Sequence, residues 1–487
     1  MSIKQVINAF TITVLLVSIS VGGERENLET PLINSAELLT PDDLFEMALK
    51  YNPDHQIFIQ NASLSGANLR SAWGTLMPSL DVNFQLSRSE YYNPSYVEAN
   101  GSVAAYPITE QGYAMTIDTL ANGHIVVGFD PNSPTAITYG VPQGKSSASY
   151  GWANLRETIN LGGQQYYTIK NAGLQNDMNE LQVAASKQGL QYSVKQNYYT
   201  VLAQKKLFDL TLKVLQQKQE QLHLAQARYE VGSVTELDVL QAEIDVGNQE
   251  NAVIEAENSL KLAREELNRV LGIDLNSEYS LAEEFSIFNP DFDLVTLSAQ
   301  AVTARPDFLV YQKQEIYSNN SVKINRGEFL PDLSASFSHT RSQNSGKDMD
   351  FTLNPRNKNT SLSLTLSWNL FSGFADEANY QGSRVALRNA QFDRKKQEQL
   401  IDQEVRQAYY NLVQTYEQSR VTEKNRELAS RQLALERERY RLGASSQLNL
   451  RIAQITFEQA EVDYISSIFN FWSNLAALER AVGSKLN

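Results

Sequence analysis

The stretch Arg228-Tyr229-Glu230-Val231-Gly232 recurs 211 residues later as Arg439-Tyr440-Arg441-Leu442-Gly443. The same offset relates Gly272 to Gly483, so one register holds without a gap over the 75 residues from 198 to 272. An internal match of this length indicates a tandem duplication. Each stretch ends on a glycine between two helical patterns, which predicts that one helix ends there and the chain reverses into the next.

The upstream parts of the two halves match at a different offset of 253 residues. Asn52-Pro53-Asp54 corresponds to Arg305-Pro306-Asp307, and Phe84 corresponds to Phe337. The first half is therefore longer by the difference between the two offsets, and the surplus forms an enlarged loop. We divide the chain into a signal peptide (1–23), a first repeat (24–272, with the enlarged loop at 89–147), a linker (273–304), a second repeat (305–483) and a tail (484–487).

In each half, the sequence pattern predicts a helix, a strand, a loop, a strand and two long helices joined by a turn. The first helix is expected from Thr40 to Leu76, with Thr40 as N-cap and Pro78 ending it. The long helices are expected at 164–230, 235–271, 376–441 and 446–482. A helix of 67 residues, at about 1.5 Å each, is about 100 Å long. Apolar residues at alternating spacings of 3 and 4 predict coiled-coil packing, as at Val462, Ile465, Phe469, Trp472 and Ala476.

Alternating polar and apolar residues predict four strands, around 80–87, 148–161, 333–340 and 360–370. In the last, Leu362, Leu364 and Leu366 share one face, and serine and threonine fill the other. The 148–161 segment keeps the alternation but changes phase near Trp152. Lengths of nine to eleven residues with one apolar face are typical of transmembrane strands, and two hairpins of a soluble sandwich remain the alternative.

The context of these strands favours transmembrane strands over a soluble sandwich. Very long helices flank each hairpin and leave no obvious core for a soluble sheet. Aromatic residues cluster at both strand ends, as interfacial girdles do: Trp368, Phe371, Phe374, Tyr166 and Tyr167 at one end, and Tyr91, Tyr92, Tyr96 and Tyr150 at the other. A sheet in lipid must close, because unpaired backbone groups there are costly. Closed barrels need about eight strands or more, so two or three copies must share one barrel.

Composition limits the cellular compartments and the partners that are compatible with this chain. A net charge of −14 and a pI near 5.0 argue against nucleic acid. Cysteine is absent, which removes disulfides and thiolate metal sites. Residues 1–23 read as an export signal, with a retained membrane anchor as the alternative. No other segment approaches 18 uncharged apolar residues, which excludes a helical transmembrane protein.

The run at 228–240, Arg-Tyr-x-Val-Gly-x-x-Thr-x-Leu-Asp-Val-Leu, resembles the helical-hairpin tip of TolC-like outer membrane efflux proteins. The second stretch with Leu448 and the prolines that precede strands, Pro78 and Pro331, also match. The resemblance implies a mixed α and β fold. Three copies would contribute four transmembrane β-strands each to a 12-stranded β-barrel above a periplasmic α-barrel of coiled-coil hairpins. It also implies that the tips dock on a periplasmic membrane-fusion adaptor, which links them to an inner-membrane pump or ATP-driven exporter.

The same resemblance locates a gate at the tips. Asp238 and Tyr440 match two of the family's locking positions, whereas Ser445 stands at the locking arginine. Asn449 and Ile452 stand at the acidic-ring positions, so a cation-binding ring is not expected. Asp238 has two readings, a lock residue or a compensating charge at a helix N-terminus. The tip and docking residues are Arg228, Tyr229, Gly232, Asp238, Arg439, Tyr440, Gly443, Ser445, Asn449 and Ile452.

No catalytic or cofactor motif is present, so we expect no enzyme activity, cofactor or metal. The four histidines lie in different elements without ligand spacing, which predicts isolated surface or barrel residues. The leading hypothesis is an outer-membrane exit duct of a tripartite efflux or type I secretion system. The alternative is a non-pore periplasmic coiled-coil protein with a structural or adhesive role. Drugs, metal ions and secreted polypeptides share such a duct, so substrate choice belongs mainly to the pump.

Overall fold

The structure, a computed structural model, describes residues 38–91, 95–97, 103–105, 114–119, 125–130, 144–283, 286–345, 347, 349–442 and 444–486. The expected signal peptide, much of the enlarged loop and Gly443 lie outside this part. The chain divides into two compact units. The first comprises residues 1–64, 177–312 and 392–487, and the second comprises 65–176 and 313–391.

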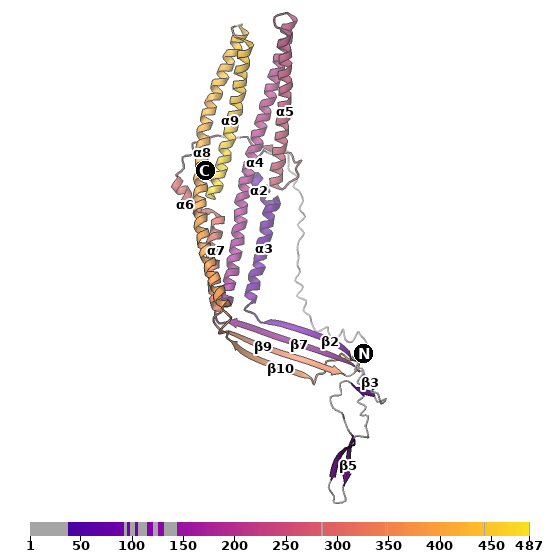
Figure 1. Cartoon of the computed structure of the whole chain (residues 1–487). Coiled ribbons are helices and arrows are strands. Elements are labelled where there is room, and N and C mark those ends of the chain that lie inside the picture. The colour runs from indigo at the N-terminus through magenta and orange to yellow at the C-terminus, as the bar shows by residue number, and fades with distance from the viewer. Residues whose placement is uncertain are drawn as a thin grey trace. The chain divides into compact units, whose positions relative to one another are not determined.

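The helices occur in pairs of equal length (Figure 1). α2 (Pro41–Tyr51) and α6 (Leu294–Ala304) have 11 residues each, and α3 (Pro53–Gly74) and α7 (Pro306–Gly327) have 22 each. The long helices α4 (Gln164–Glu230) and α8 (Ala375–Arg441) have 67 each, and α5 (Glu236–Leu271) and α9 (Gln447–Val482) have 36 each. The four long helices predicted from the sequence are therefore present, within a residue of their expected bounds.

The single helix predicted at 40–76 is wrong, because the chain leaves the helix at Asn52. Asn52 is extended (φ −65°, ψ 119°), as expected for a residue that precedes proline. Its side chain accepts a hydrogen bond from the backbone N–H of His55 (2.8 Å) and donates one to the carbonyl of Val270 (2.8 Å). The break is therefore a capped corner between α2 and α3. Arg305, before Pro306, makes the corresponding corner between α6 and α7.

The core of the first unit has two apolar clusters. One joins α2, α4 and α5 around the buried residues Leu44, Val194, Tyr198, Leu202, Leu267 and Leu271. The other joins α6, the start of α7, α8 and α9 around Leu297, Phe308, Ile401, Leu412, Phe471 and Leu478. Beside the first cluster, strand β1 (Leu38–Leu39) pairs in parallel with β8 (Ser280–Leu281). Tyr198 donates a hydrogen bond from its hydroxyl to the carbonyl of Ala282 (2.6 Å), and burial raises its pKa to about 12.

The second unit contains a four-stranded antiparallel sheet in the order β10-β9-β7-β2 (Figure 1). Its strands are β2 (Ser79–Tyr91), β7 (Gly144–Asn160), β9 (Asp332–Ser345) and β10 (Lys358–Ser367). Three of them exceed the expected nine to eleven residues, because the ladders continue beyond the apolar run. β2 and β10 are the two edges of this sheet, so each has one side without a strand partner within the described chain.

An unbroken register sorts the four strands into two faces. Leu80 pairs with Leu155, Leu155 with Phe337 and Phe337 with Leu362, so these residues lie on one face. Cross-strand neighbours on that face are mostly apolar, with Glu157 as an acidic exception. The opposite face carries mostly polar residues such as Asn83 and Thr340, together with the aromatic Trp152. The expected phase change near Trp152 is wrong, since the pairing of β7 continues through Trp152 and only its composition changes there.

The chain passes closely between the sheet and the helices that flank it. Leu161 donates its backbone N–H to the carbonyl of Pro331 (3.3 Å), and a Cβ on Gly162 would lie 2.5 Å from the Cα of Gly327. Glycine at both positions therefore allows the two backbones to touch. Within the enlarged loop, β5 (Ala114–Thr119) pairs antiparallel with β6 (Ile125–Asp130). β3 (Ser95–Val97) pairs likewise with β4 (Val103–Ala105).

None of the helices in the described ranges is long and apolar enough to cross a membrane.

Candidate functional site

Hydrogen bonds hold both ends of the turn between α4 and α5. Gly232, in the left-handed region (φ 73°), donates to the carbonyl of Tyr229 (2.8 Å), and Ser233 donates to that of Arg228 (2.8 Å). Thr235 then caps α5 in a capping box with Asp238, whose carboxylate accepts from the Thr235 backbone N–H (2.9 Å) and hydroxyl (2.7 Å). These hydrogen bonds lower the pKa of Asp238.

The turn between α8 and α9 uses different side chains. Ser446 caps α9 by accepting the backbone N–H of Asn449 (3.2 Å), which occupies the position equivalent to Asp238. Because Asn449 carries no charge, the reciprocal carboxylate of a capping box is missing. Ser445 instead donates to the carboxylate of Glu436 (2.7 Å), which also binds Arg439 (2.6 Å). The serine hydrogen bond lowers the pKa of Glu436, and the Arg439 charge adds to that effect. Gly443 lies outside the described residues.

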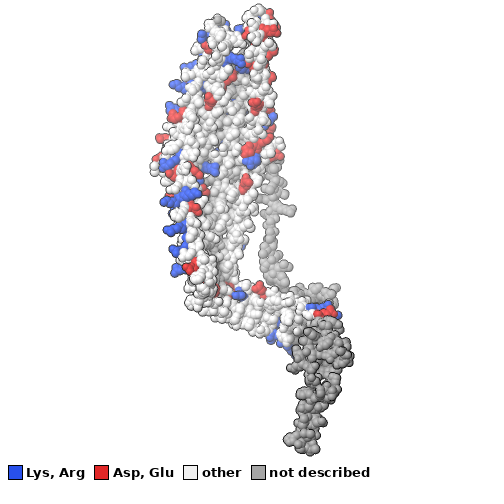
Figure 2. All heavy atoms as spheres, viewed as in Figure 1, with Lys and Arg blue, Asp and Glu red and all other residues white. Residues whose placement is uncertain are grey.

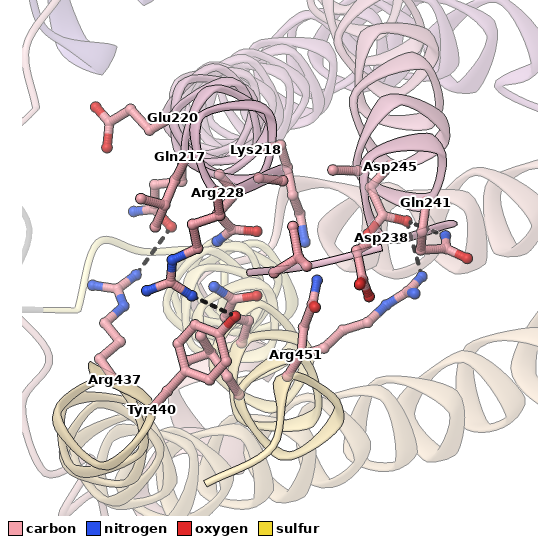
Figure 3. Close-up of a pocket in the computed structure, with 18 of the residues that line it drawn as sticks. Gln217, Lys218, Glu220, Arg228, Asp238, Gln241, Asp245, Arg437, Tyr440 and Arg451 are labelled. Carbon is pink, nitrogen blue, oxygen red and sulfur yellow. Dashed lines mark hydrogen bonds and ion pairs between the residues drawn. The ribbon is translucent and has the colours of Figure 1, made fainter. Parts of the chain in front are cut away.

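A cavity of about 700 Å³ lies between the two helical hairpins near these turns. Residues of all four helices line it, and Figure 3 shows their side chains converging from opposite sides. We call this space the tip cavity. Its lining carries both signs of charge: Lys218, Arg228, Arg437, Arg441 and Arg451, with Glu220, Asp238 and Asp245.

Two contacts from α4 to α8 cross the tip cavity (Figure 3). Arg228 donates to the hydroxyl of Tyr440 (3.1 Å), and its guanidinium carbon lies 5.3 Å from the centre of the Tyr440 ring. Arg437 donates to the side-chain carbonyl of Gln217 (3.3 Å). The first contact combines a hydrogen bond with a cation–π attraction, so it fixes both the distance and the direction of the two side chains.

Two ion pairs link the first hairpin to α9. Arg451 of α9 binds Asp245 of α5 with a 2.9 Å separation between nitrogen and oxygen, and the Asp245 side chain is mostly buried. Farther from the turns, Lys218 of α4 lies 3.8 Å from the carboxylate of Glu458 in α9. Burial raises the pKa of Glu458, although the lysine opposes that shift. The Asp245–Arg451 pair is thus a short, partly shielded connection between the hairpins.

Asp238 has its hydrogen-bond partner in Thr235, which favours the helix-end reading over the lock reading. Three arginines near the turns carry the charge that a locking arginine would supply to Asp238. They bind other carboxylates: Arg439 binds Glu436, Arg441 binds Glu438 and Arg451 binds Asp245. Tyr440 takes its partner from Arg228, within the expected set. Tyr229 and Ile452 are exposed.

Sequence reasoning missed Asp245, the acidic partner of Arg451. A signal was available, since Asp245 follows Asp238 by seven residues, which is two helical turns, and therefore shares its helix face. Asp238 was expected to be the acid in a cross-hairpin link. The structure places that link two turns away from the end of the helix.

Across the described residues, no group of three or more histidine, aspartate or glutamate side chains is arranged to hold a metal ion. One histidine expectation is wrong: His55 is buried in the first unit, with its Nδ1 3.1 Å from the hydroxyl of Ser186. His339 lies on the sheet, with its Nδ1 2.8 Å from the hydroxyl of Thr360.

Comparison with known proteins was made for sequence and for structure. A family model described as outer membrane efflux protein matches residues 44–273 and 297–484. The alkaline protease secretion protein AprF of Pseudomonas aeruginosa is 26% identical over 208 residues, which are 41% of this chain. The aligned stretch spans 40% of the length of AprF.

Solved structures resemble the chain along most of its length. The CmeC outer membrane channel of Campylobacter jejuni superposes with a TM-score of 0.72 at 17% identity, covering 91% of this chain and 85% of that one. The outer membrane protein VceC of Vibrio cholerae gives a TM-score of 0.69 at 16% identity, covering 92% and 97%. At these identities the likeness establishes the fold.

Proposed function

The chain belongs to the outer membrane efflux protein family, which places it in the outer membrane, and we propose that it is an exit duct there. In this proposal three copies form one pore that passively conducts substrates from the periplasm to the outside. A periplasmic membrane-fusion adaptor and an inner-membrane pump or ATP-driven exporter deliver the substrates and supply the energy. The single observation that carries the proposal is a four-stranded sheet with one apolar face and two free edges.

The free edges support assembly of several copies. Among the described residues, backbone groups along β2 and β10 have no strand partner on their outer sides, and such groups cost several kcal/mol each in lipid. Pairing β2 of one copy with β10 of the next satisfies both edges at once. Three copies then supply twelve strands, an even number within the range of bacterial barrels.

The composition of the two faces supports a lipid-facing exterior and a polar interior. Leu362 and Leu364 on the apolar face are 81% and 72% exposed in the single chain. A soluble monomer would not expose such a regular row of large apolar side chains to water. The serine-rich opposite face would line a water-filled channel. At the strand ends near the helices, Trp368 donates its indole N–H to the carbonyl of Phe329 (3.1 Å), which suits an interfacial girdle. The side chains of Tyr91, Tyr92 and Tyr96, expected in the other girdle, lie outside the described part.

We propose that the contacts across the tip cavity hold the periplasmic end closed. Opening requires the α4/α5 and α8/α9 hairpins to separate, and Arg228–Tyr440 and Asp245–Arg451 oppose that separation. Ser445, Asn449 and Ile452 contribute neither a locking arginine nor an acidic ring. In this chain the closing role therefore passes to Asp245 and Arg451. The exposed tip surfaces around Tyr229 and Leu448 remain for the adaptor.

Conductance through planar bilayers tests this proposal. Asp245→Asn and Arg451→Gln should each raise the resting ion conductance, because each breaks the short ion pair between hairpins. The charge-reversed pair, Asp245→Arg with Arg451→Asp, should restore a low conductance. Arg420→Gln is a matched control, since Arg420 contacts Glu417 and the Tyr416 ring on its own helix. A wild-type protein without any conductance would refute the duct. Equal conductance in wild type and both single variants would refute the closing role alone.

A further inference from the structure

The two repeats place an arginine at the same point of the sheet. Arg88 of β2 and Arg341 of β9 are equivalent at the 253-residue offset, and each follows the first leucine of its apolar face, Leu80 or Leu333, by eight residues. Even spacing keeps each arginine on the face of that leucine. Both side chains are exposed. The apolar face thus ends in a cation on both strands, at the end away from the strand start.

A second cation stands directly beside Arg341. Lys358 of β10 is the cross-strand partner of Arg341, and it is also exposed. Like charges directly opposite each other destabilise a sheet. Neither side chain makes an ion pair with the residues that the structure describes, so no protein carboxylate there relieves the repulsion. A bound anion between the two would relieve it.

The same end of the sheet gathers further positive charge. Lys145 and Arg88 share one carboxylate, Glu90, at 3.6 and 3.7 Å. The β9–β10 connection folds over the apolar face, because the buried Ser147 hydroxyl donates to the carbonyl of Lys347 (2.8 Å) and accepts the backbone N–H of Asp350 (2.9 Å). Its side chains Lys347 and Arg356 are exposed. Figure 2 shows that the visible surface of the sheet is mostly uncharged, with a few basic and acidic atoms on it.

The distances suit a lipid boundary. Eight residues of a strand span about 26 Å along the strand, which at the tilt of about 35–45° of barrel strands is about 20 Å along the membrane normal. The apolar band of outer-membrane barrels is about 25 Å tall, and the long arginine and lysine side chains extend across the difference. Arginine and lysine that end such a band lie at the depth of lipid headgroups. Paired arginine and lysine recognise phosphate through charge-assisted hydrogen bonds, which arginine makes in bidentate form.

We propose that Arg88, Arg341 and Lys358, with Lys145 and Arg356, form a basic collar that binds the phosphate groups of the phosphorylated glycolipid in the outer leaflet. The inference rests on the proposed insertion in the outer membrane. It assigns the collar to the leaflet that faces outward, since the β9–β10 connection and the collar lie at the strand ends opposite the helices. A collar repeated in each copy would fix the depth and tilt of the barrel.

The test measures binding of lipid A carrying both phosphates to the full chain in detergent micelles, by microscale thermophoresis. Arg341→Gln with Lys358→Gln should weaken binding at least about tenfold, from the loss of charge-assisted hydrogen bonds. The control Arg384→Gln with Arg388→Gln removes the same charge from exposed positions of α8 and should leave the affinity unchanged. Wild type should bind lipid A stripped of phosphate as weakly as the collar variant binds the intact lipid.

Equal affinity of wild type and collar variant, or indifference of wild type to the phosphates, would overturn the collar. Conductance of the same samples in planar bilayers separates this result from the duct itself. A collar variant that conducts as wild type does is folded and inserted, so its loss of lipid A affinity is specific. A wild type that does not conduct refutes the duct whatever its lipid binding.

Discussion

Gly232, Gly272 and Gly483 end helices in nearly the same left-handed backbone conformation, with φ of 73°, 75° and 81°. They differ in what a methyl group would meet. A Cβ on Gly232 has open space around it, whereas one on Gly483 lies 2.9 Å from the Cγ of Arg305. A Cβ on Gly272 overlaps the carbonyl group of Tyr51, with 2.6 Å to its carbon, and lies 2.9 Å from the Cα of Asn52.

Substitution by alanine should therefore destabilise the protein in the order Gly272, Gly483, Gly232. The left-handed conformation alone costs about 1–2 kcal/mol for alanine, and that is the whole effect expected for Gly232→Ala. Gly483→Ala adds a close contact with the Arg305 side chain, which Asp307 and Glu404 hold, and contacts of 3.2 Å with the backbone of Ala304 and Arg305, where no atoms overlap as closely as at Gly272. Gly272→Ala adds a collision with backbone that belongs to the corner between α2 and α3, for roughly 1–3 kcal/mol more.

Guanidinium unfolding of the purified protein in detergent, followed by far-UV circular dichroism, measures the series. The three variants share the change from glycine to alanine and nearly the same φ, so their differences isolate the space around each position. The Gly272→Ala midpoint should be lowest, and Gly232→Ala should lie nearest to wild type. Equal midpoints for Gly272→Ala and Gly232→Ala would show that α5 and the α2–α3 corner do not meet as described.

Three further outcomes are expected. Leu364→Arg should prevent membrane insertion, because a charge on the lipid face costs about 2–4 kcal/mol at mid-membrane. Ser363→Arg, on the opposite face, should be tolerated. Outer-membrane fractionation compares the two variants, and an equal loss of both from the membrane fraction would refute the assignment of faces. Burial, aided by Lys187, lowers the pKa of His55 below the usual 6.5, so the unfolded chain takes up the proton first and stability falls as pH drops below about 6.5. Melting at about pH 7.5 and about pH 5.5 should show this loss, and His55→Gln should reduce it; an unchanged slope in the variant would contradict the assignment. Asp238→Ala should raise resting conductance less than Asp245→Asn, because Asp238 binds Thr235 of its own turn; the reverse order would restore Asp238 as a lock.

The helices were predictable because their signals are local. Thr235 and Ser446 mark helix starts, and Gly272 and Gly483 mark ends, each within a few residues of the feature they control. The break at Asn52 shows the limit of that reasoning. Pro53 was visible in the sequence, but the helix was expected to continue through it to Leu76. The hydrogen bond from Asn52 to Val270, 218 residues away, depends on packing that no local signal records.

The tip was predictable in location and not in its contacts. The duplicated Arg-Tyr-x-x-Gly stretches identified both turns, and Arg228 and Tyr440 were among the expected residues. Their partnership crosses the two repeats, however, and depends on how α4 and α8 are aligned lengthwise. Asp245 was missed for the same reason, since a coiled-coil pattern gives the face of a residue but not its height against a neighbouring helix.

Disulfide cross-linking between the two free edges of the sheet tests the central claim, that three copies complete one closed barrel. The chain has no cysteine, so every disulfide bond that forms must involve the introduced cysteines. One cysteine is placed on β2 and one on β10, on the polar face, in combinations of Asp81, Asn83 or Gln85 with Ser361, Ser363 or Thr365. At least one combination should give oxidised products of two and three linked chains and no larger species. A bond formed only within single chains, or a ladder that continues beyond three, would contradict the account.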